Sequence, residues 1–184
     1  MALPTPPPPA IPIVETPRLT LRGHTLDDFP HTSAMWSDPE VTRHIGGRPL
    51  TREEAWNKFL RMAGHWSLLG FGYWVVCERA SGRFAGEVGF ASFEREIDPP
   101  FAGAPESGWV LAPWAQGKGY ATEAVRAATE WLEGRFGPVR TVCLIDRDHP
   151  ASIRVAEKCG YRRWVETTYH GTEVVVLDRG PRAA

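Results

Sequence analysis

The sequence ESGWVLAPWAQGKGYATEA, residues 106–124, predicts a strand that runs through a turn with two glycines directly into a helix. The first amides of a helix have no partner within the helix, and the helix dipole adds about half a positive charge at that end. Gly117 and Gly119 remove side chains that would keep an anion from these amides, and Ala121 and Thr122 are also small. Together these features predict a cradle for a pyrophosphate group.

The turn departs from both common nucleotide-binding loops. Lys118 lies between two glycines and outside the G-x-x-x-x-G-K-[ST] frame, and Thr122 stands where the dinucleotide fingerprint has its third glycine. A nucleotide-binding enzyme that uses this loop in a different frame is nevertheless one alternative. Another is a tight strand-to-helix connection that uses its glycines for backbone geometry alone.

Hydrophobic patterning on both sides of this segment predicts further strands and helices. Thr51 and Glu54 form a capping box at the start of one helix. The strand–helix–strand unit over residues 106–145 needs a crossover, which predicts one parallel pair in an otherwise hairpin-like sheet. We therefore expect an α/β (α+β) fold, a mixed, mostly antiparallel twisted sheet of about seven strands with helices on both faces. The expected strands are 18–22, 71–78, 84–93, 106–111, 139–145, 161–169 and 172–178, and the expected helices are 25–37, a short one after 38, 51–69, 118–136 and 150–159.

Length, composition and charge predict one compact soluble domain. The chain has 184 residues, of which 42% are hydrophobic and 23% charged, and its formal net charge is −1. This balance gives no basic field for nucleic acid or for an anionic membrane, so we expect neither as a partner. Three cysteines are too few for a disulfide framework, and no apolar run approaches the ~20 residues that cross a bilayer. We therefore expect a cytoplasmic protein.

The two ends of the chain differ in composition from its body. Seven of the first 17 residues are proline, which lacks an amide donor and favours extended geometry. We expect a flexible proline-rich leader over residues 1–15, a single domain over residues 16–179 and a short tail over residues 180–184.

The glycine turn and two distant segments carry a resemblance to a known family. Residues 116–121, QGKGYA, fit the [QR]-x-x-G-x-[GA] signature of the GNAT superfamily of acyl-CoA-dependent N-acyltransferases. The wider string GYATEA, residues 119–124, is similar to the RimJ/RimL-like branch, which acetylates ribosomal-protein N-termini. Residues 15–22, ETPRLTLR, and 151–161, ASIRVAEKCGY, resemble the entry strand and the closing helix of that branch. The resemblance implies the GNAT fold and a single acetyltransferase domain.

The resemblance implies which residues hold acetyl-CoA as the cosubstrate. In the family, the strand before the turn splays from its neighbour, and the pantetheine arm pairs with the exposed edge like an added strand. Val110 and Leu111 would supply those backbone contacts, and one amide there would face the thioester carbonyl. The pyrophosphate contacts carry over to Gln116, Gly117, Lys118, Gly119, Ala121 and Thr122.

The resemblance also implies a catalytic base and a group beside the thiol. A primary amine is mostly protonated at pH 7, so a base within its reach assists the attack. Glu106 stands where this branch often places a carboxylate; Asp146 and His149 are alternatives, and a solvated strand-end charge is the other interpretation of Glu106. Ser152 matches the serine of the branch pattern N-x-x-S and could protonate the leaving thiolate or contact the cofactor; a first-turn serine that caps amides is the alternative.

The same pattern shows one departure from the family. His149 stands where the branch has asparagine. Neutral histidine can donate and accept through its two nitrogens, although in a bulkier shape. We expect His149 to contact the cofactor; a pH-sensitive role toward the acceptor and a surface histidine without a function are the alternatives.

The acceptor cleft is expected beside the central strand. We expect Trp36 and Trp109 to line its cleft and the irregular loop 94–105 to border it. Acidic residues of this loop, Glu94, Glu96 and Asp98, would suit a cationic acceptor, although a solvated loop is the simpler interpretation.

The resemblance predicts an N-acetyltransferase that moves the acetyl group of acetyl-CoA to a primary amine by direct attack in a ternary complex. The acceptor would be a protein N-terminus or a small-molecule amine. The alternative is a non-catalytic acyl-CoA-binding or sensing module. Two exposed terminal strands would allow a homodimer. The histidines pair with no cysteine or carboxylate at ligand spacing, so we expect no metal.

Overall fold

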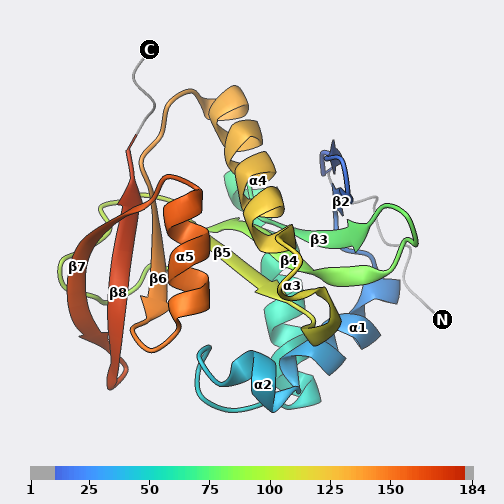
Figure 1. The fold of residues 1–184 in the computed structure, drawn as a ribbon, viewed down its shortest axis with the longest axis horizontal. Coiled ribbons are helices and arrows are strands. Elements are labelled where there is room, and N and C mark those ends of the chain that lie inside the picture. Colours follow the sequence, from blue (N-terminus) through green and yellow to red (C-terminus); the bar gives the residue numbers. More distant parts are fainter. Residues whose placement is uncertain (1–10, 181–184) are drawn as a thin grey trace.

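The computed structural model describes residues 11–180, which fold around one eight-stranded sheet (Figure 1). The strand order is β1-β2-β3-β4-β5-β6-β8-β7, and every neighbouring pair is antiparallel except β5 and β6. The predicted fold class is confirmed, with β1 as the additional strand. None of the helices within these residues is both long and apolar enough to cross a membrane.

The strands are β1 Val14–Glu15, β2 Leu19–Arg22, β3 Tyr73–Glu78, β4 Phe84–Ala91, β5 Glu106–Leu111, β6 Thr141–Asp146, β7 Arg162–Tyr169 and β8 Thr172–Arg179. The helices are α1 Phe29–Trp36, α2 Pro39–Thr42, α3 Arg52–Leu69, α4 Tyr120–Phe136 and α5 Pro150–Lys158, with 3-10 turns η1 Leu26–Asp28 and η2 Pro113–Ala115.

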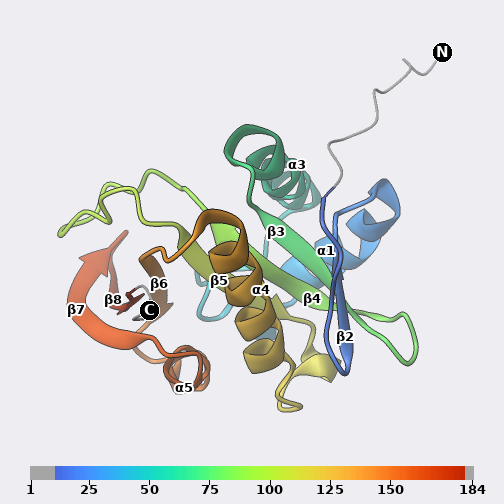
Figure 2. The same cartoon turned by 90° about the horizontal axis from the view of Figure 1, so that it is seen from above.

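Helices cover both faces of the sheet and bury a separate core on each (Figure 2). Because side chains alternate along a strand, β3 sends Trp74 and Val76 into the core shared with α4 and α5, and Val75 into the core shared with α1 and α3. Strand β5 divides in the same way, with Val110 on the α1 and α3 side and Leu111 on the α4 side. The even-numbered residues of β5 therefore face α1 and α3.

The sheet opens between its two parallel strands. Strand β4 pairs with β5 at every residue from Glu106 to Leu111, whereas β5 pairs with β6 only where Glu106 lies beside Val142. From that pair the two strands diverge toward their carboxyl ends (Figure 1). Strand β6 instead pairs along its whole length with β8. The result is a wedge-shaped gap in the middle of the sheet, with α2 near its open end (Figure 1).

The first described residues belong to the sheet. Val14 pairs with Leu21, and the Trp74 indole donates a 2.8 Å hydrogen bond to the carbonyl of Pro12. The expected leader reached residue 15, so the ordered fold begins earlier than residue 16. The rest of that leader, residues 1–10, and the tail from residue 181 lie outside the described residues.

A buried carboxylate fastens α1 to the sheet. Glu87 of β4 is 1% exposed and accepts hydrogen bonds from the Thr32 hydroxyl at 2.9 Å and the Trp36 indole at 3.2 Å. Its Oε1 also lies 3.3 Å from Nε2 of His24. Burial raises the pKa of Glu87, but these hydrogen bonds and the His24 charge outweigh burial, so its pKa lies below the usual 4.5. Glu87 is therefore an ionised structural group that holds α1 against β4.

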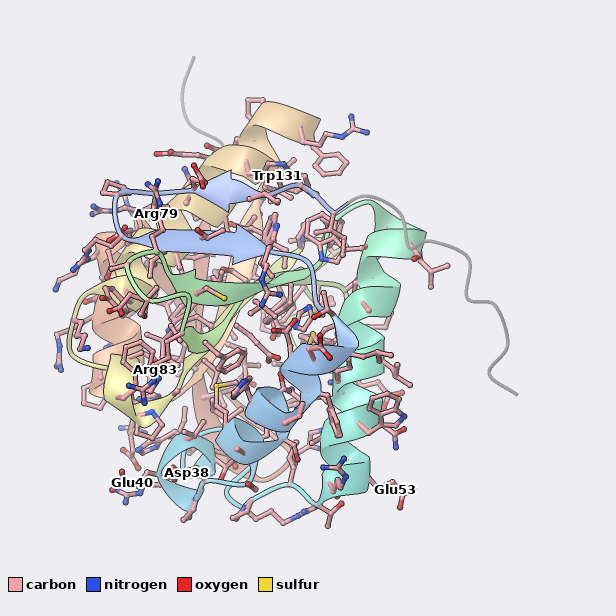
Figure 3. The ribbon with its side chains drawn as sticks, turned by 90° about the vertical axis from the view of Figure 1, so that its right-hand side faces the viewer. Asp38, Glu40, Glu53, Arg79, Arg83 and Trp131 are labelled. Atoms are coloured by element: carbon pink, nitrogen blue, oxygen red, sulfur yellow. The ribbon has the colours of Figure 1, made fainter. Side chains whose placement is uncertain are left out.

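We expect Glu87→Gln to lower the free energy of unfolding by about 2 kcal/mol, because the amide keeps the shape but loses the charge that its donors bind. Urea unfolding at pH 7 measures this. The stabilisation by Glu87 is present above the unfolded-state pKa and is lost as pH falls through the lower folded-state pKa, so the difference between the two proteins should shrink in acid. Glu53→Gln, on the outer side of α3 (Figure 3), is the control and should change stability by less than about 0.5 kcal/mol. Equal effects of the two substitutions would contradict this role.

Candidate active site

The glycine turn forms the predicted backbone cradle at the start of α4. Gly117 and Gly119 have φ of +74° and +79°, a left-handed conformation that other residues adopt only at a cost. The first helical hydrogen bond runs from the Glu123 amide to the Gly119 carbonyl at 3.1 Å. Within the described residues, no hydrogen bond is donated by the amides of residues 117–122. These amides therefore have no partner among the described residues, which is the geometry that the predicted pyrophosphate cradle requires.

Ion pairing at the chain's entry strand fixes the position of this cradle. The Glu123 carboxylate accepts hydrogen bonds from the Thr16 hydroxyl at 2.6 Å and the Arg18 amide at 3.0 Å, and it pairs with the Arg18 guanidinium at 2.6 Å. Arg18 also donates to the carbonyl of Lys118 at 2.9 Å. The two segments that carry the family resemblance, residues 15–22 and 119–124, thus meet in space and hold the turn between them.

Strand β5 presents backbone groups to the gap beside β6. The Ala112 amide donates to Ala85 of β4 at 2.9 Å, and alternate residues of an antiparallel ladder point the same way. The amide and carbonyl of Val110 therefore point to β4, whereas those of Trp109 and Leu111 point into the gap. The side-chain amide of Gln116 donates to the Leu111 carbonyl at 3.0 Å and links this edge to the cradle. Of the two residues predicted to supply backbone contacts, Leu111 has its peptide groups directed into the gap and Val110 has them directed to β4; those of Trp109 also point into the gap.

A cavity of about 490 Å³ fills the gap and extends between the sheet and α3. It brings together predicted residues from distant parts of the chain. Residues of the cradle do not line it; they lie at the end of β5 beyond η2. The predicted residues that line the cavity are Trp36, Glu106, Trp109, Val110, Asp146, His149 and Ser152.

Glu106 lies on the α3 side of this cavity and is paired with an arginine of loop 94–105. Its side chain accepts two hydrogen bonds from Arg95, at 2.6 Å from Nε and 2.7 Å from Nη2. Glu106 is 7% exposed, and Arg95 lies over the rings of Phe93 and Tyr169. Such a bidentate pair fixes the carboxylate at the point where β5 and β6 begin to diverge. Arg95 had no signal in the sequence, because the loop brings it to Glu106 only after folding.

The other two candidate bases belong to a second polar group at the open end of the gap. Asp146 accepts a 2.8 Å hydrogen bond from the Asp148 amide, and its Oδ2 lies 2.9 Å from Nδ1 of His44. Burial raises the pKa of Asp146, but these hydrogen bonds outweigh it and its pKa is lowered. His149 stacks on His44 with ring centroids 4.5 Å apart, and burial lowers its pKa, with the His44 charge adding to the effect. His149 is therefore neutral near pH 7 and can accept a proton.

The cavity also contains residues that the sequence analysis did not single out. Lys58 and Arg61 reach it from α3, His44 from the turn after α2, and Tyr73 from β3. Helical spacing of 58 and 61 was visible in the sequence, but the face of α3 that meets the cavity depends on how the helix packs on the sheet. Cys143 lines the cavity too, and burial raises its pKa well above the usual thiol value. A protonated thiol is a weak nucleophile.

Comparisons with known proteins agree with this geometry. A family model described as an acetyltransferase (GNAT) domain matches residues 18–162. The uncharacterized protein YkkB of Bacillus subtilis (strain 168) is 33% identical over 132 residues, which cover 68% of this chain and 70% of YkkB.

Solved structures share the fold along nearly the whole chain. A putative GNAT-family acetyltransferase from Bordetella pertussis superimposes with a TM-score of 0.81 at 30% identity, over 92% of this chain and 99% of that one. RimL, a ribosomal-protein α-N-acetyltransferase solved in complex with coenzyme A, has a TM-score of 0.77 at 18% identity, over 94% and 100% of the two chains. The family match, the glycine cradle and the gap between β5 and β6 lead to one conclusion: this chain belongs to the GNAT family and is an acetyl-CoA-dependent acetyltransferase.

Proposed function

We propose that the protein transfers the acetyl group of acetyl-CoA to the nitrogen of a primary amine, and that both substrates meet in the gap between β5 and β6. The observation that carries this proposal is a pair of backbone features: the peptide groups of Trp109 and Leu111, which point into the gap, and the amides of residues 117–122 at the start of α4, which donate no hydrogen bond among the described residues. Such a pair suits a ligand with a long amide-containing arm and an anionic end, and CoA has both.

In the proposed complex, the amides of Gly117, Lys118, Gly119, Ala121 and Thr122 bind the pyrophosphate, and Gln116 positions the strand edge beside it. The pantetheine arm pairs with the backbone groups of Trp109 and Leu111, which point into the gap. Val110 lines the cavity wall. His149 and Ser152, at the start of α5, contact the arm from the opposite side of the gap.

The proposed reaction is direct attack without an acyl-enzyme. The amine nitrogen attacks the thioester carbon, the carbon–sulfur bond breaks and CoA leaves as a thiolate. Glu106, held in place by Arg95, accepts the hydrogen bond and then the proton of the amine. The Ser152 hydroxyl donates to the thiolate. All three cysteines are buried and burial raises the pKa of each thiol, that of Cys159 to about 11, so none is an activated nucleophile.

The cradle predicts a loss of cofactor affinity in Gly119→Leu. A side chain at this position must adopt the left-handed conformation, and its Cβ would lie 3.4 Å from Nη2 of Arg18, beside the amides. Loss of two charge-assisted hydrogen bonds should weaken CoA binding ~100-fold, measured by calorimetry.

Gly103→Leu is the matched control for this variant. Gly103 has φ of +77°, and an added Cβ there would meet no atom within 4 Å. This variant carries the same backbone strain away from the cradle and should keep its CoA affinity. Equal affinities in both variants and the wild type would rule out the cradle as the pyrophosphate site.

We expect Glu106→Gln to lower kcat by ~100-fold or more while CoA affinity stays unchanged, because the amide cannot accept the proton. His149→Asn restores the residue usual in the branch, and its kcat should stay within about tenfold of the wild type. Release of free CoA thiol in the presence of an amine measures both. A larger loss in His149→Asn than in Glu106→Gln would transfer the role of base to His149.

Direct transfer predicts that acetyl-CoA alone leaves no mark on the protein. Intact-mass spectrometry after mixing the protein with acetyl-CoA, without an amine, should show the unmodified chain. A stoichiometric acetyl adduct, especially on Cys143, would show an acyl-enzyme instead.

A further inference from the structure

The α3 wall of the cavity carries two cations without an ionic partner. Lys58 and Arg61 lie three residues apart, on one face of α3, and both line the cavity. Neither takes part in an ion pair among the described residues. The ammonium of Lys58 instead lies 4.0 Å from the centre of the Trp36 ring, and the guanidinium of Arg61 lies 5.1 Å from the centre of Phe93.

The acidic residues of the cavity do not balance these charges. Glu106 is neutralised by its bidentate pair with Arg95, and Asp146 is engaged by His44 and the Asp148 amide. Glu87 lies beneath the wall, where Thr32, Trp36 and His24 already surround its carboxylate.

The environment of Lys58 favours the arrival of an anion. Burial lowers the pKa of Lys58, the charges of Arg61 and Arg95 add to this effect, and together they outweigh Glu87 and Glu106, so that the pKa lies at about 8. The ammonium has thus lost water without gaining a direct carboxylate partner. An anionic group bound between Lys58 and Arg61 would supply that partner in a site of low dielectric constant, where the attraction is stronger than in water.

The acidic loop residues considered for a cationic acceptor do not reach this site. Glu94, Glu96 and Asp98 are exposed, and none of them lines the cavity. The side chain that the loop does place in the cavity is Arg95. The charge that an acceptor meets inside is therefore positive, opposite to the charge of the loop surface.

We propose that the acceptor is a small amine that also carries a carboxylate, which Lys58 and Arg61 bind on the α3 wall. Its amine then lies toward Glu106 and the opening between β5 and β6. This inference rests on the proposed acetyl transfer and names the class of its substrate. Free amino acids and related amino carboxylates have this chemistry, whereas polyamines lack the anion and would be repelled by the two cations.

The test compares each of the common amino acids with its own α-carboxamide, which keeps the amine and the side chain and removes the negative charge. For the amino acid that the wild type acetylates fastest, Arg61→Gln and Lys58→Met should raise KM by about tenfold to a hundredfold. For the carboxamide, both variants should have the same KM as the wild type. The acid and the carboxamide differ in the pKa of their amine. The KM of a variant is therefore divided by the wild-type KM for the same acceptor, which removes the effect of that difference. Arg52→Gln, on the same helix but outside the cavity, is the matched control and should change neither value.

Arg61 is exposed and Lys58→Met keeps the alkyl stem on Trp36, so both variants should fold; a thermal unfolding curve checks this. Calorimetric titration of amino acids into the CoA-loaded protein measures acceptor binding without turnover. The inference is overturned if no amino carboxylate binds or reacts, or if the variants affect acid and carboxamide alike. Acetylation of neutral amines in that case would leave the proposed acetyl transfer intact. Failure of CoA to bind, or of every amine to release thiol, would instead overturn the proposed function. In that case, titration of amino acids into the protein without CoA tests the α3 wall site, which charge-dependent binding would still support.

Discussion

Strand β5 pairs along its whole length with β4 but at only one position with β6. The candidate active site depends on this difference, because it leaves one edge of β5 open. Peptide groups inside a protein almost always find hydrogen-bond partners, so an interior strand edge without them is costly unless a ligand or water supplies the missing bonds. The divergence of the two strands places this edge at the centre of the molecule, between two helical layers (Figure 2). In the proposed complex, the cofactor arm enters there and completes the sheet.

The start of α4 adds, beyond the end of β5, further backbone groups without hydrogen-bond partners in the part of the chain that the structure describes. Helices leave their first amides unpaired in every protein, but here a turn with two left-handed glycines aligns those amides with the open edge of β5. Gln116 connects the two by its bond to Leu111, and Glu123 anchors the helix start to Arg18. The cradle is therefore held in place by the segment that leads into β2.

The acceptor side of the cavity depends on side-chain charges held by the α1 and α3 layer. Glu87 fastens α1 to β4, and Arg95 fixes Glu106 at the apex of the gap. Because these carboxylates are engaged by other groups, Lys58 and Arg61 give the α3 wall of the cavity a positive charge. In the proposed complex, backbone groups at the edge of β5 bind the cofactor, and charged side chains of the α3 wall face the acceptor.

Local sequence determined the elements and the cradle, because helix caps, glycine turns and hydrophobic alternation act between residues close in the chain. It therefore predicted the strand–turn–helix unit around Gly117 and Gly119 and the parallel pair of strands. It did not reveal that the amide and carbonyl of Trp109, rather than those of Val110, point into the gap, since the direction of a peptide group depends on strand register. Nor did it reveal Arg95 beside Glu106, or Lys58 and Arg61 in the cavity. Those neighbours lie 11 to 48 residues from Glu106 along the chain, so only the packing of loop 94–105 and α3 against the sheet brought them together.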